Sequence, residues 1–466
     1  MPIYIYNSLS RKKEQFIPQN SPQVKIYTCG VTVYDACHIG HARSLFIFDL
    51  IRRYLKYQGY QVSFVRNITD IDDKIINRAI ELKIDWQELV KKYIASYEND
   101  LLSLGIKKAD FEPRATENIP EMIDYIRKLV DRGLAYESAG DVYFNVRKFA
   151  NYGRLSGQGI DQMHAGVRIS LAESKNDPLD FALWKRSKEN EPSWPSPWGL
   201  GRPGWHIECS VMSQKFLQTE TLDIHAGGRD LIFPHHENEL AQSESYTGKQ
   251  FAKYWIHHGL LTINAQKMSK SLGNFITIQD FIAKYHNVEL LKFFFLSAHY
   301  AHPIDYSDAK IQEARQALQR INIFMDKAKL VKPVFGGLFF KFHPKAIVLL
   351  KKKFLAALDD DFNTPEALAC VFELVNLANK NIKRAGFVCH AQTVLNEMLN
   401  ILGISLKPVK IETEINEEMI KSMMQNRVDA KKAKDYALAD KIRKELEEQG
   451  VILEDTKDGT IWRRKL

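Results

Sequence analysis

The N-terminal part of the chain alternates between strand-like and helix-like hydrophobic patterns. Residues 24–28 form a β-rich run that ends at Cys29, and apolar side chains then recur at helical spacing from Ala42 to Tyr57. Gly59 closes that helix, and residues 61–67 form a second β-rich run. A strand, a loop, a helix and a strand in this order are typical of a βαβ unit. We therefore expect an α/β protein with a doubly wound parallel sheet.

Residues 111–203 interrupt this alternation and have the pattern of an inserted subdomain. Residues 136–146 alternate on either side of a Ser-Ala-Gly turn, which predicts a hairpin. Residues 189–203 are rich in Pro, Gly and Trp, so we expect them to be irregular. The alternation then resumes, with a strand expected over 221–226 and a helix from Glu237 onward.

The C-terminal part predicts helices and then a small mixed module. An apolar stripe at helical spacing follows Asp308, and residues 349–358 and 365–382 continue an all-α region. The stripe consists of Ile311, Ala314, Leu318, Ile321 and Met325. In the last segment we expect a charged helix over 433–449 and a strand pair around 451–453 and 460–462.

These patterns divide the chain into five expected parts. They are the first half of a catalytic α/β domain (1–110), an inserted connective subdomain (111–203), the second half of the catalytic domain (204–307), a helical bundle (308–410) and a C-terminal module (411–466).

Charge adds one localised feature to this picture. The net charge is +8, but the segment from Lys310 to Lys353 alone carries eleven basic and two acidic residues. An anionic partner is therefore expected at this segment and not over the whole surface, the alternative being a solvated basic helix face. The tail from residue 411 is close to neutral, so recognition of a polyanion there would be local.

Composition excludes several classes of protein. No stretch approaches the roughly 18 apolar residues that a membrane span needs. The basic residues of the N-terminus follow its apolar ones, the reverse of a secretory signal. The five cysteines are too few for a disulfide framework and favour a cytoplasmic protein with reduced thiols. They are Cys29, Cys37, Cys209, Cys370 and Cys389, of which we take Cys37, Cys370 and Cys389 as structural.

Two short motifs have the chemistry of a nucleotide site. His38-Ile39-Gly40-His41 opens the first helix, where free N–H groups favour an anion and two imidazoles can donate to phosphate. Residues 267–271 (KMSKS) place Lys267 and Lys270 in a loop that can close on phosphates. Each motif alone could be a capped helix or a basic surface turn. Together, in this order and context, they are far more specific.

The pair of motifs resembles the class I aminoacyl-tRNA synthetases, and further segments resemble the cysteinyl-tRNA synthetase family over essentially the whole chain. These segments are residues 29–35 (CGVTVYD), 67–74 (NITDIDDK), 203–210 (PGWHIECS) and 233–239 (FPHHENE). The resemblance implies a Rossmann-like catalytic domain that joins L-cysteine to tRNA(Cys), using ATP with Mg²⁺, through a cysteinyl adenylate. It also implies a monomer, with His38, His41, Lys267 and Lys270 stabilising the phosphate charge.

Four residues of the chain are of types that bind metal ions. His235 and Glu239 are four residues apart and share a helix face, while Cys29 and Cys209 are expected to end or follow strands. Two thiolates, an imidazole and a carboxylate suit Zn²⁺, but their spacing alone favours two buried cysteines and a helix salt bridge. The resemblance reverses this choice, since all four positions match the family's zinc ligands. The neighbouring His236 could be mistaken for the ligand.

The same resemblance assigns the substrate pockets. Gly30, Thr69 and Trp205 belong to the expected cysteine pocket, with ordinary packing as the alternative for Thr69 and Trp205. For ATP, the expected contacts are Gly40 between the two histidines, Gly228, which lets adenosine approach the backbone, and Asp230, which accepts from a ribose hydroxyl. A metal–thiolate bond would reject serine without a separate editing domain.

Contacts to tRNA are expected in the basic segment and in the tail. Arg315, Arg320, Lys327 and residues 351–353 could meet phosphates. In the tail, Lys431, Tyr436 and Trp462 combine cations with stacking surfaces suited to unpaired bases.

Two other functions remain open at this point. The chain could activate cysteine and pass it to an aminosugar, or it could be a non-catalytic, zinc-bearing RNA-binding paralog. The roughly 150 residues after the catalytic part argue against the first, and the intact His38, His41, Lys267 and Lys270 argue against the second.

Overall fold

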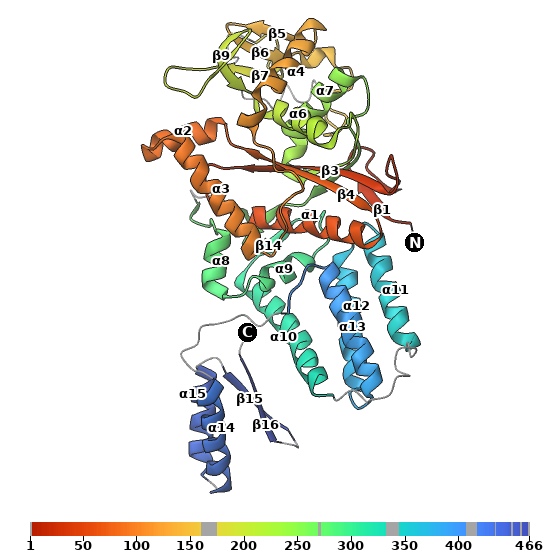
Figure 1. The fold of residues 1–466 in the computed structure, drawn as a ribbon, viewed down its shortest axis with the longest axis vertical. Coiled ribbons are helices and arrows are strands. Elements are labelled where there is room, and N and C mark those ends of the chain that lie inside the picture. Colours follow the sequence, from red (N-terminus) through yellow and green to blue (C-terminus); the bar gives the residue numbers. More distant parts are fainter. Residues whose placement is uncertain are drawn as a thin grey trace.

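The centre of the computed structural model is a parallel sheet of four strands in the order β11-β10-β3-β4 (Figure 1). The structure describes residues 2–159, 175–268, 272–331, 344–406, 417–433, 435–448, 451–456 and 459–464. The four strands are β3 (Gln23–Thr32), β4 (Gln61–Thr69), β10 (Leu222–Gly228) and β11 (Ala252–His258). β3 is central and pairs with β4, its near neighbour in sequence, and with β10, which follows the insertion.

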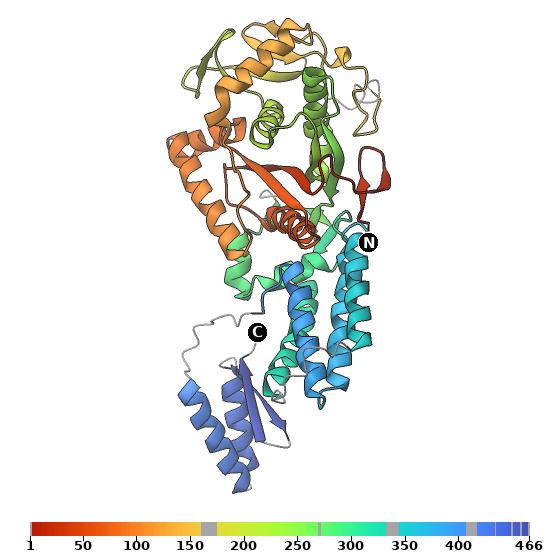
Figure 2. The ribbon, with the colours of Figure 1, turned by 45° about the vertical axis from the view of Figure 1, so that its right-hand side comes forward.

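Helices cover both faces of this sheet, as expected for a doubly wound arrangement (Figures 1 and 2). The crossover helix α1 (Ile39–Tyr57) lies on one face, with Leu45, Ile47 and Leu50 among its buried residues. On the other face lie α6 (Trp205–Leu217) and α7 (Glu237–Thr247). Between β10 and α7 the chain makes a 3₁₀ turn (Arg229–Leu231) and a π-helical turn (Ile232–His236). The α/β class predicted from the sequence is confirmed.

The insertion builds an antiparallel sheet of five strands beside the parallel one, in the order β5-β6-β7-β9-β8. The predicted hairpin over 136–146 is present as β5 and β6. The expectation of an irregular 189–203 is wrong, because β8 and β9 form a second hairpin there. Its strand β8 is at the sheet edge, where Pro195 costs no ladder hydrogen bond. The strands are β5 (Ala135–Ser138), β6 (Asp141–Phe144), β7 (Phe181–Arg186), β8 (Trp194–Ser196) and β9 (Gly199–Pro203).

Glycine at position 201 allows β9 to lie against β7. A Cβ at Gly201 would be 2.4 Å from both the Lys185 carbonyl oxygen and Trp184 Nε1. We expect Gly201→Ala to lower the free energy of unfolding by about 1–3 kcal/mol, the usual cost of overpacking. The midpoint of urea unfolding measures this effect. Leu200→Ala, at a neighbour that is 60% exposed, should change the free energy by less than about 0.5 kcal/mol. Equal midpoints for Gly201→Ala and the wild type would contradict the steric argument.

Further helices and two small sheets complete the catalytic part. Three helices that the hydrophobic pattern had not singled out follow β4: α2 (Asp73–Leu82), α3 (Trp86–Ser103) and α4 (Ile119–Asp131). The strands β1 (Tyr4–Asn7) and β2 (Lys12–Gln15) form an N-terminal hairpin. After β11 come β12 (Leu261–Ile263), β13 (Gln266–Lys267), α8 (Ile278–Tyr285), α9 (Glu289–Leu296) and β14 (Ile304–Tyr306).

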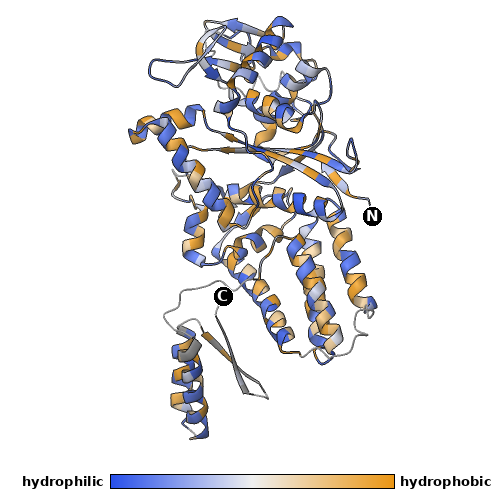
Figure 3. Cartoon of the chain, viewed as in Figure 1, coloured by the Kyte–Doolittle hydropathy of each residue, from blue (hydrophilic) through white to orange (hydrophobic). Residues whose placement is uncertain are grey.

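Four helices then pack together beneath the catalytic part (Figure 1). They are α10 (Asp308–Leu330), α11 (Lys345–Asp359), α12 (Thr364–Lys380) and α13 (Ala385–Ile401). The predicted stripe on α10 is buried at all five positions, from Ile311 to Met325. Figure 3 shows apolar residues along these helices. One continuous hydrophobic core joins them to the α1 face of the sheet.

The last segment forms a module with a small core of its own, which includes Ile420, Leu446 and Val451. It contains α14 (Glu417–Lys432), α15 (Tyr436–Glu448) and the antiparallel pair β15 (Val451–Thr456) and β16 (Gly459–Arg464). The helix predicted over 433–449 and the strand pair are present, and α14 is an addition. Across the described helices of the chain, none is both long enough and apolar enough to span a membrane.

Candidate functional site

The residues His38 to His41 begin helix α1 at the carboxyl edge of the sheet. His38 is the N-cap, and its Nδ1 accepts hydrogen bonds from the backbone N–H groups of Gly40 (3.0 Å) and His41 (3.2 Å). The His41 Nδ1 accepts from the His38 N–H in return, and the two rings stack 3.8 Å apart. The two imidazoles therefore form one rigid unit at the helix terminus, half-buried beside the predicted nucleotide site.

Burial sets the protonation of this pair. It lowers the pKa of His38 to about 4, and burial together with the neighbouring His38 lowers the pKa of His41 to about 3. Both rings are thus neutral near pH 7. The folded protein binds fewer protons here than the unfolded chain, whose histidines titrate near pH 6.5. The stability that this difference contributes is present above about pH 6.5 and is lost as the pH falls toward 4.

We expect His41→Asn to flatten the pH dependence of stability by up to about 1.4 kcal/mol per pH unit over the range from about 4.5 to 6. The measurement is the free energy of unfolding in urea at several pH values. His286→Asn is the matched control, because His286 is exposed and its left-handed backbone (φ 54°) suits asparagine. A slope identical in His41→Asn and the wild type would contradict a His41 that is neutral in the folded protein.

The segment that follows the KMSKS motif is attached directly to this helix terminus. The N–H of Ile39 donates to the Ile276 carbonyl (3.0 Å), and the N–H of Ile278 donates to the Cys37 carbonyl (3.0 Å). The Phe275 ring meets the His38 ring edge-on at 5.3 Å. Lys267 is exposed on β13. Lys270 lies outside the described residues. At the start of the loop, Met268 Cε would lie 4.0 Å from a Cβ at Gly40, between the two histidines.

The ends of β10 and β11 supply the predicted adenosine side of the site. A Cβ on Gly228 would lie 2.4 Å from Asp230 Oδ1 and 3.6 Å from His258 Cε1, so a larger residue there would displace the Asp230 carboxylate. Asp230 is exposed in the turn that follows. His258 ends β11 next to Gly228, and burial lowers its pKa to about 4. Gly228 and Asp230 thus lie at the same sheet edge as the α1 terminus.

A buried cluster of thiols, imidazoles and carboxylate lies at the same edge. The cluster contains the four predicted ligands Cys29, Cys209, His235 and Glu239, whose ligand atoms all lie within 4.8 Å of one another. The Cys29 and Cys209 Sγ atoms are 3.7 Å apart, and His235 Nε2 is 2.7 Å from Glu239 Oε1. Cys209 Sγ is 3.7 Å from His235 Nε2. Donors of these types at these separations fit a four-coordinate soft metal ion.

One positional expectation for this cluster is wrong. Cys29 lies in β3, but Cys209 lies in the second turn of helix α6 and not at a strand end. The helix begins at Trp205 after Gly204, and its buried face carries the thiol to the sheet. The four ligand positions come from β3, α6, the π-helical turn and α7.

Sequence reasoning missed most of a histidine network around this cluster. His225 Nε2 is 2.5 Å from Glu239 Oε2, His206 Nδ1 is 2.9 Å from His235 Nδ1, and His236 Nδ1 is 2.8 Å from His257 Nε2. These partners fix the orientation of the candidate ligands. His236 Nε2 is also 3.2 Å from Cys29 Sγ, so Cys29, His225, His236 and Glu239 form a second group that could hold an ion. The available signal was the presence of His225 and His257 in strands that are buried along almost their whole length.

The electrostatics of the cluster follow from burial and mutual contact. Burial raises the pKa of the Cys29 thiol, and Cys209 and Glu239 add to the rise. Against the effect of burial, the Glu239 carboxylate and the Cys209 thiol raise the pKa of His235 to about 9. The paired imidazoles His235 and His225 hold the pKa of the Glu239 carboxyl well below its usual range, although burial opposes this. Without a bound ion, the Glu239 carboxylate is thus ionised and paired with the His235 imidazole.

The predicted cysteine pocket adjoins this cluster. The Trp205 ring stacks on His235 at 3.8 Å, and the Thr69 hydroxyl donates to Glu208 Oε2 at 2.6 Å. The Gly30 N–H donates to Asn67 Oδ1 at 2.8 Å, and a Cβ at Gly30 would lie 1.5 Å from the Asn67 carbonyl oxygen. The strands β3 and β4 can therefore approach each other this closely only if residue 30 is glycine. Asn67 and Glu208 are additional polar residues of this pocket that were not predicted.

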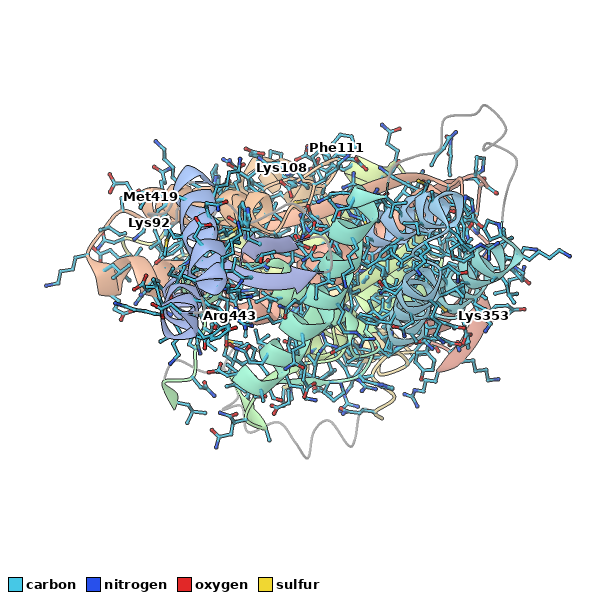
Figure 4. All side chains as sticks on the ribbon, turned by 90° about the horizontal axis from the view of Figure 1, so that it is seen from below. Lys92, Lys108, Phe111, Lys353, Met419 and Arg443 are labelled. Carbon is cyan, nitrogen blue, oxygen red and sulfur yellow. The ribbon has the colours of Figure 1, made fainter. Side chains whose placement is uncertain are left out.

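The basic residues predicted to meet tRNA have differing surroundings. On α10, Arg315 and Lys327 are half-buried, and the Arg320 guanidinium lies 5.0 Å from the centroid of the Phe372 ring. Lys351 pairs with Glu397 at 2.7 Å. Seen from below in Figure 4, Lys353 lies on the opposite side of the molecule from Met419 and Arg443 of the terminal module.

Within the terminal module, the residues predicted to contact tRNA differ in their exposure to solvent. Tyr436 is 64% exposed, and Lys431 is half-buried. Trp462 packs against the module's core. Arg427 is buried, and its Nη1 donates to the Thr460 hydroxyl at 3.3 Å, which joins α14 to β16.

Comparisons with known proteins define the class. Residues 15–316 match the family described as "tRNA synthetases class I (C) catalytic domain", and residues 353–407 match the DALR domain. The solved structure of Mycobacterium tuberculosis methionyl-tRNA synthetase bound by methionyl-adenylate has the same fold, with a TM-score of 0.60 at 14% identity over 82% of this chain and 92% of that one. Fold and site therefore define a class I aminoacyl-tRNA synthetase.

Full-length relatives narrow the class to one family. A cysteine--tRNA ligase of Clostridioides difficile is 47% identical over 466 residues, covering 99% of each chain. One of Anoxybacillus flavithermus is 47% identical over 480 residues, covering all of both chains. The chain belongs to the cysteine--tRNA ligase family.

Proposed function

We propose that this chain joins L-cysteine to tRNA(Cys) in two steps, with ATP and Mg²⁺, through a cysteinyl adenylate. The observation that carries the proposal is the shared sheet edge, where the His38–His41 terminus, Gly228 and Asp230 adjoin the buried thiol cluster. A nucleotide and a thiol-bearing amino acid would meet there. Activity of this kind is what the family's name describes, and the similarity to its members extends over the full length.

The first step needs positioning and charge stabilisation and no protein nucleophile. The carboxylate of cysteine attacks the α-phosphorus of ATP, and the bond to the β-phosphate oxygen breaks to release pyrophosphate. His38 and His41, held neutral and stacked, offer ring N–H groups to phosphate oxygens, while Lys267 and Lys270 supply positive charge. In the second step a terminal ribose hydroxyl of tRNA attacks the cysteinyl carbonyl carbon, and AMP leaves.

For the metal we propose Zn²⁺ held by Cys29, Cys209, His235 and Glu239. The set provides two sulfurs, one imidazole nitrogen and one carboxylate oxygen, all within reach of one ion. When bound, zinc supplies a soft Lewis acid for which a thiolate is a much better ligand than a hydroxyl group. His206 and His225 would then orient His235 and Glu239 from behind. The place of His236 beside Cys29 makes it the residue to compare in any test of the ligand set.

We assign Gly30, Thr69 and Trp205 to the cysteine pocket. Gly30 keeps the strand pair closed and leaves its own position free of a side chain, and Trp205 forms a wall that is stacked on His235. The Thr69 hydroxyl is already donated to Glu208, so its oxygen is available to a substrate only as an acceptor. Gly40, Gly228 and Asp230 are assigned to ATP.

For tRNA we propose phosphate contacts on α10, at Arg315, Arg320 and Lys327, and base contacts in the terminal module at Lys431, Tyr436 and Trp462. Helix α10, which carries these basic residues, extends downward from the catalytic part on the side where the terminal module lies (Figure 1). Tyr436 offers an exposed ring, and Trp462 offers the part of its ring that the module's core leaves open. We retain the five-part division of the chain, action as a monomer and a cytoplasmic location as proposals.

Metal analysis combined with aminoacylation of bulk tRNA tests the function. We expect about one zinc per chain, cysteine-dependent ATP–pyrophosphate exchange, and tRNA that carries cysteine. Exchange without charged tRNA, and a cysteine adduct formed with an aminosugar, would establish the aminosugar ligase instead. RNA binding without exchange would establish the non-catalytic paralog. In either case the proposed function would be overturned.

A further inference from the structure

The NITDIDDK segment contains a lysine that the site described above does not use. Lys74 lies in the first turn of α2, whose N-cap Asp72 accepts a hydrogen bond from the Lys74 N–H at 2.9 Å. Its ammonium lies 5.6 Å from the centroid of the Tyr34 ring. Tyr34 belongs to the short connection between β3, which contains Cys29 and Gly30 and ends at Thr32, and the His38 cap of α1. The ammonium is therefore next to the loop that joins the cysteine pocket to the ATP site.

Lys74 differs from the next cation along the same helix face. Arg78, one turn later, lies 3.7 Å from Asp35 and 2.7 Å from Glu81. Lys74 is exposed, and among the described residues no carboxylate lies within ion-pair distance of its ammonium. Arg78 holds the 33–37 loop, whereas Lys74 keeps its charge available for an anion from outside the chain.

The helix that carries Lys74 is fixed in position. Its first residue, Asp73, is paired with Lys185 of β7 at 2.6 Å and with Arg202 of β9. These contacts join α2 to the inserted sheet and so hold the start of the helix, and with it Lys74, in place. Lys74 also lies close enough to His41 for its charge to lower the pKa of that ring, although burial is the larger cause and His38 the next.

The order of the strands indicates which anion would meet Lys74. The residues assigned to adenosine lie at the end of β10 (Gly228) and just after it (Asp230), on one side of strand β3, whereas α2 follows β4 on the other side. With ATP on the β10 side, an anion on the β4 side comes from the other large substrate. A tRNA enters with an unpaired 3′ end, which carries one phosphate per nucleotide up to the reacting ribose.

We propose that the Lys74 ammonium binds a phosphate of the unpaired 3′ end of tRNA and so positions the terminal ribose for attack on the adenylate. The inference rests on the proposed function. Lysine serves phosphate as a point charge, which tolerates the small movements of a single strand. Lys74 is then a positioning residue for the second step, with no part in forming the adenylate.

Lys74→Gln tests this by separating the two steps. We expect cysteine-dependent ATP–pyrophosphate exchange within about twofold of the wild type. Single-turnover transfer from preformed adenylate to tRNA should fall about 10- to 100-fold, the usual value of one hydrogen bond to a charged group. The salt dependence gives a second readout. Loss of one phosphate contact on a single strand should reduce the slope of log(kcat/KM) for tRNA against log[salt] by about 0.7.

Two further variants complete the design. Lys74→Arg keeps the charge and should restore most of the transfer rate and the salt slope. Lys91→Gln removes an exposed lysine of α3 and should leave both steps unchanged. An equal loss of exchange and transfer in Lys74→Gln, a raised KM for cysteine in exchange, or an unchanged transfer rate would each overturn the inference. Exchange and transfer by the wild type are measured alongside. If the proposed function is wrong, the wild type itself will show no cysteine-dependent exchange or no transfer to tRNA, whereas a failure of this inference alone affects only the behaviour of the Lys74 variants.

Discussion

Replacing Cys209 with serine is expected to remove the bound zinc and most of the preference for cysteine over serine. Cys209 Sγ lies 3.7 Å from both Cys29 Sγ and His235 Nε2, so its loss removes one of two thiolates from a buried ligand set. A pocket without the metal must select by size and polarity alone, which gives discrimination of only about 10- to 200-fold. The measurements are metal content per chain and the ratio of cysteine- to serine-dependent ATP–pyrophosphate exchange.

Cys370→Ser is the matched control for this variant. Cys370 is also a buried thiol, but it lies on α12 in the core of the helical bundle. It should keep one zinc and the full selectivity, even if its stability falls by about 1–3 kcal/mol because a hydroxyl is buried. His236→Asn distinguishes the two possible ligand groups, since it should keep the metal if His235 is the ligand. A Cys209→Ser enzyme with wild-type zinc and wild-type selectivity would contradict the assignment.

Removing the second lysine of the KMSKS motif should have a comparably large effect, on the rate of adenylate formation. We expect Lys270→Ala to lower the rate of ATP–pyrophosphate exchange by about 10²- to 10³-fold, the usual cost of losing one preorganised charge contact to a transition state. ATP binding, measured by equilibrium titration, should change little, because the charge develops between the α- and β-phosphates during the reaction. The backbone hydrogen bonds between Ile39 and Ile276 and between Ile278 and Cys37 should hold one end of the loop beside the histidines in the wild type and in Lys270→Ala alike.

Lys284→Ala controls for the loss of a nearby positive charge. Lys284 lies on α8, close in sequence to the motif, and its ammonium pairs with Asp308 at 2.8 Å on the surface. An exposed pair of this kind contributes at most about 1 kcal/mol, so exchange should be unaffected. Unchanged pyrophosphate exchange in Lys270→Ala, or an equal loss of ATP affinity, would remove Lys270 from the catalytic role.

Periodicity predicted much of the fold because the elements concerned are long and amphipathic. The α10 stripe from Ile311 to Met325 is buried as expected, and α1 extends the predicted helix only at its start. The β8–β9 hairpin was missed because its strands are three and five residues long and contain the proline and glycines that usually mark irregular chain. Proline is tolerated there because β8 is an edge strand. The position of a strand in its sheet depends on the tertiary structure and cannot be predicted from the local sequence pattern.

The site was predictable by motif and resemblance, but its supporting contacts were not. The closeness of His235 and Glu239 follows from a spacing of four residues, and they are 2.7 Å apart. Cys209 was expected at a strand end because spacing alone does not show that a helix delivers it. The roles of His206, His225 and His257 depend on which buried neighbours face each other across α6, α7 and two strands, and this is decided by packing.

The pairing of β3 with β10 also sets the order in which the protein can be completed during its synthesis. Cys29 and Glu239 are 210 residues apart, so at about 5–20 residues per second the ribosome needs roughly 10–40 s between them. During that interval β3 lacks its partner β10 and Cys29 lacks the other three candidate ligands, while the whole inserted sheet is synthesised. The metal site can form only after β10 and α7 have docked, so acquiring an ion is a late event that marks a correctly assembled catalytic domain.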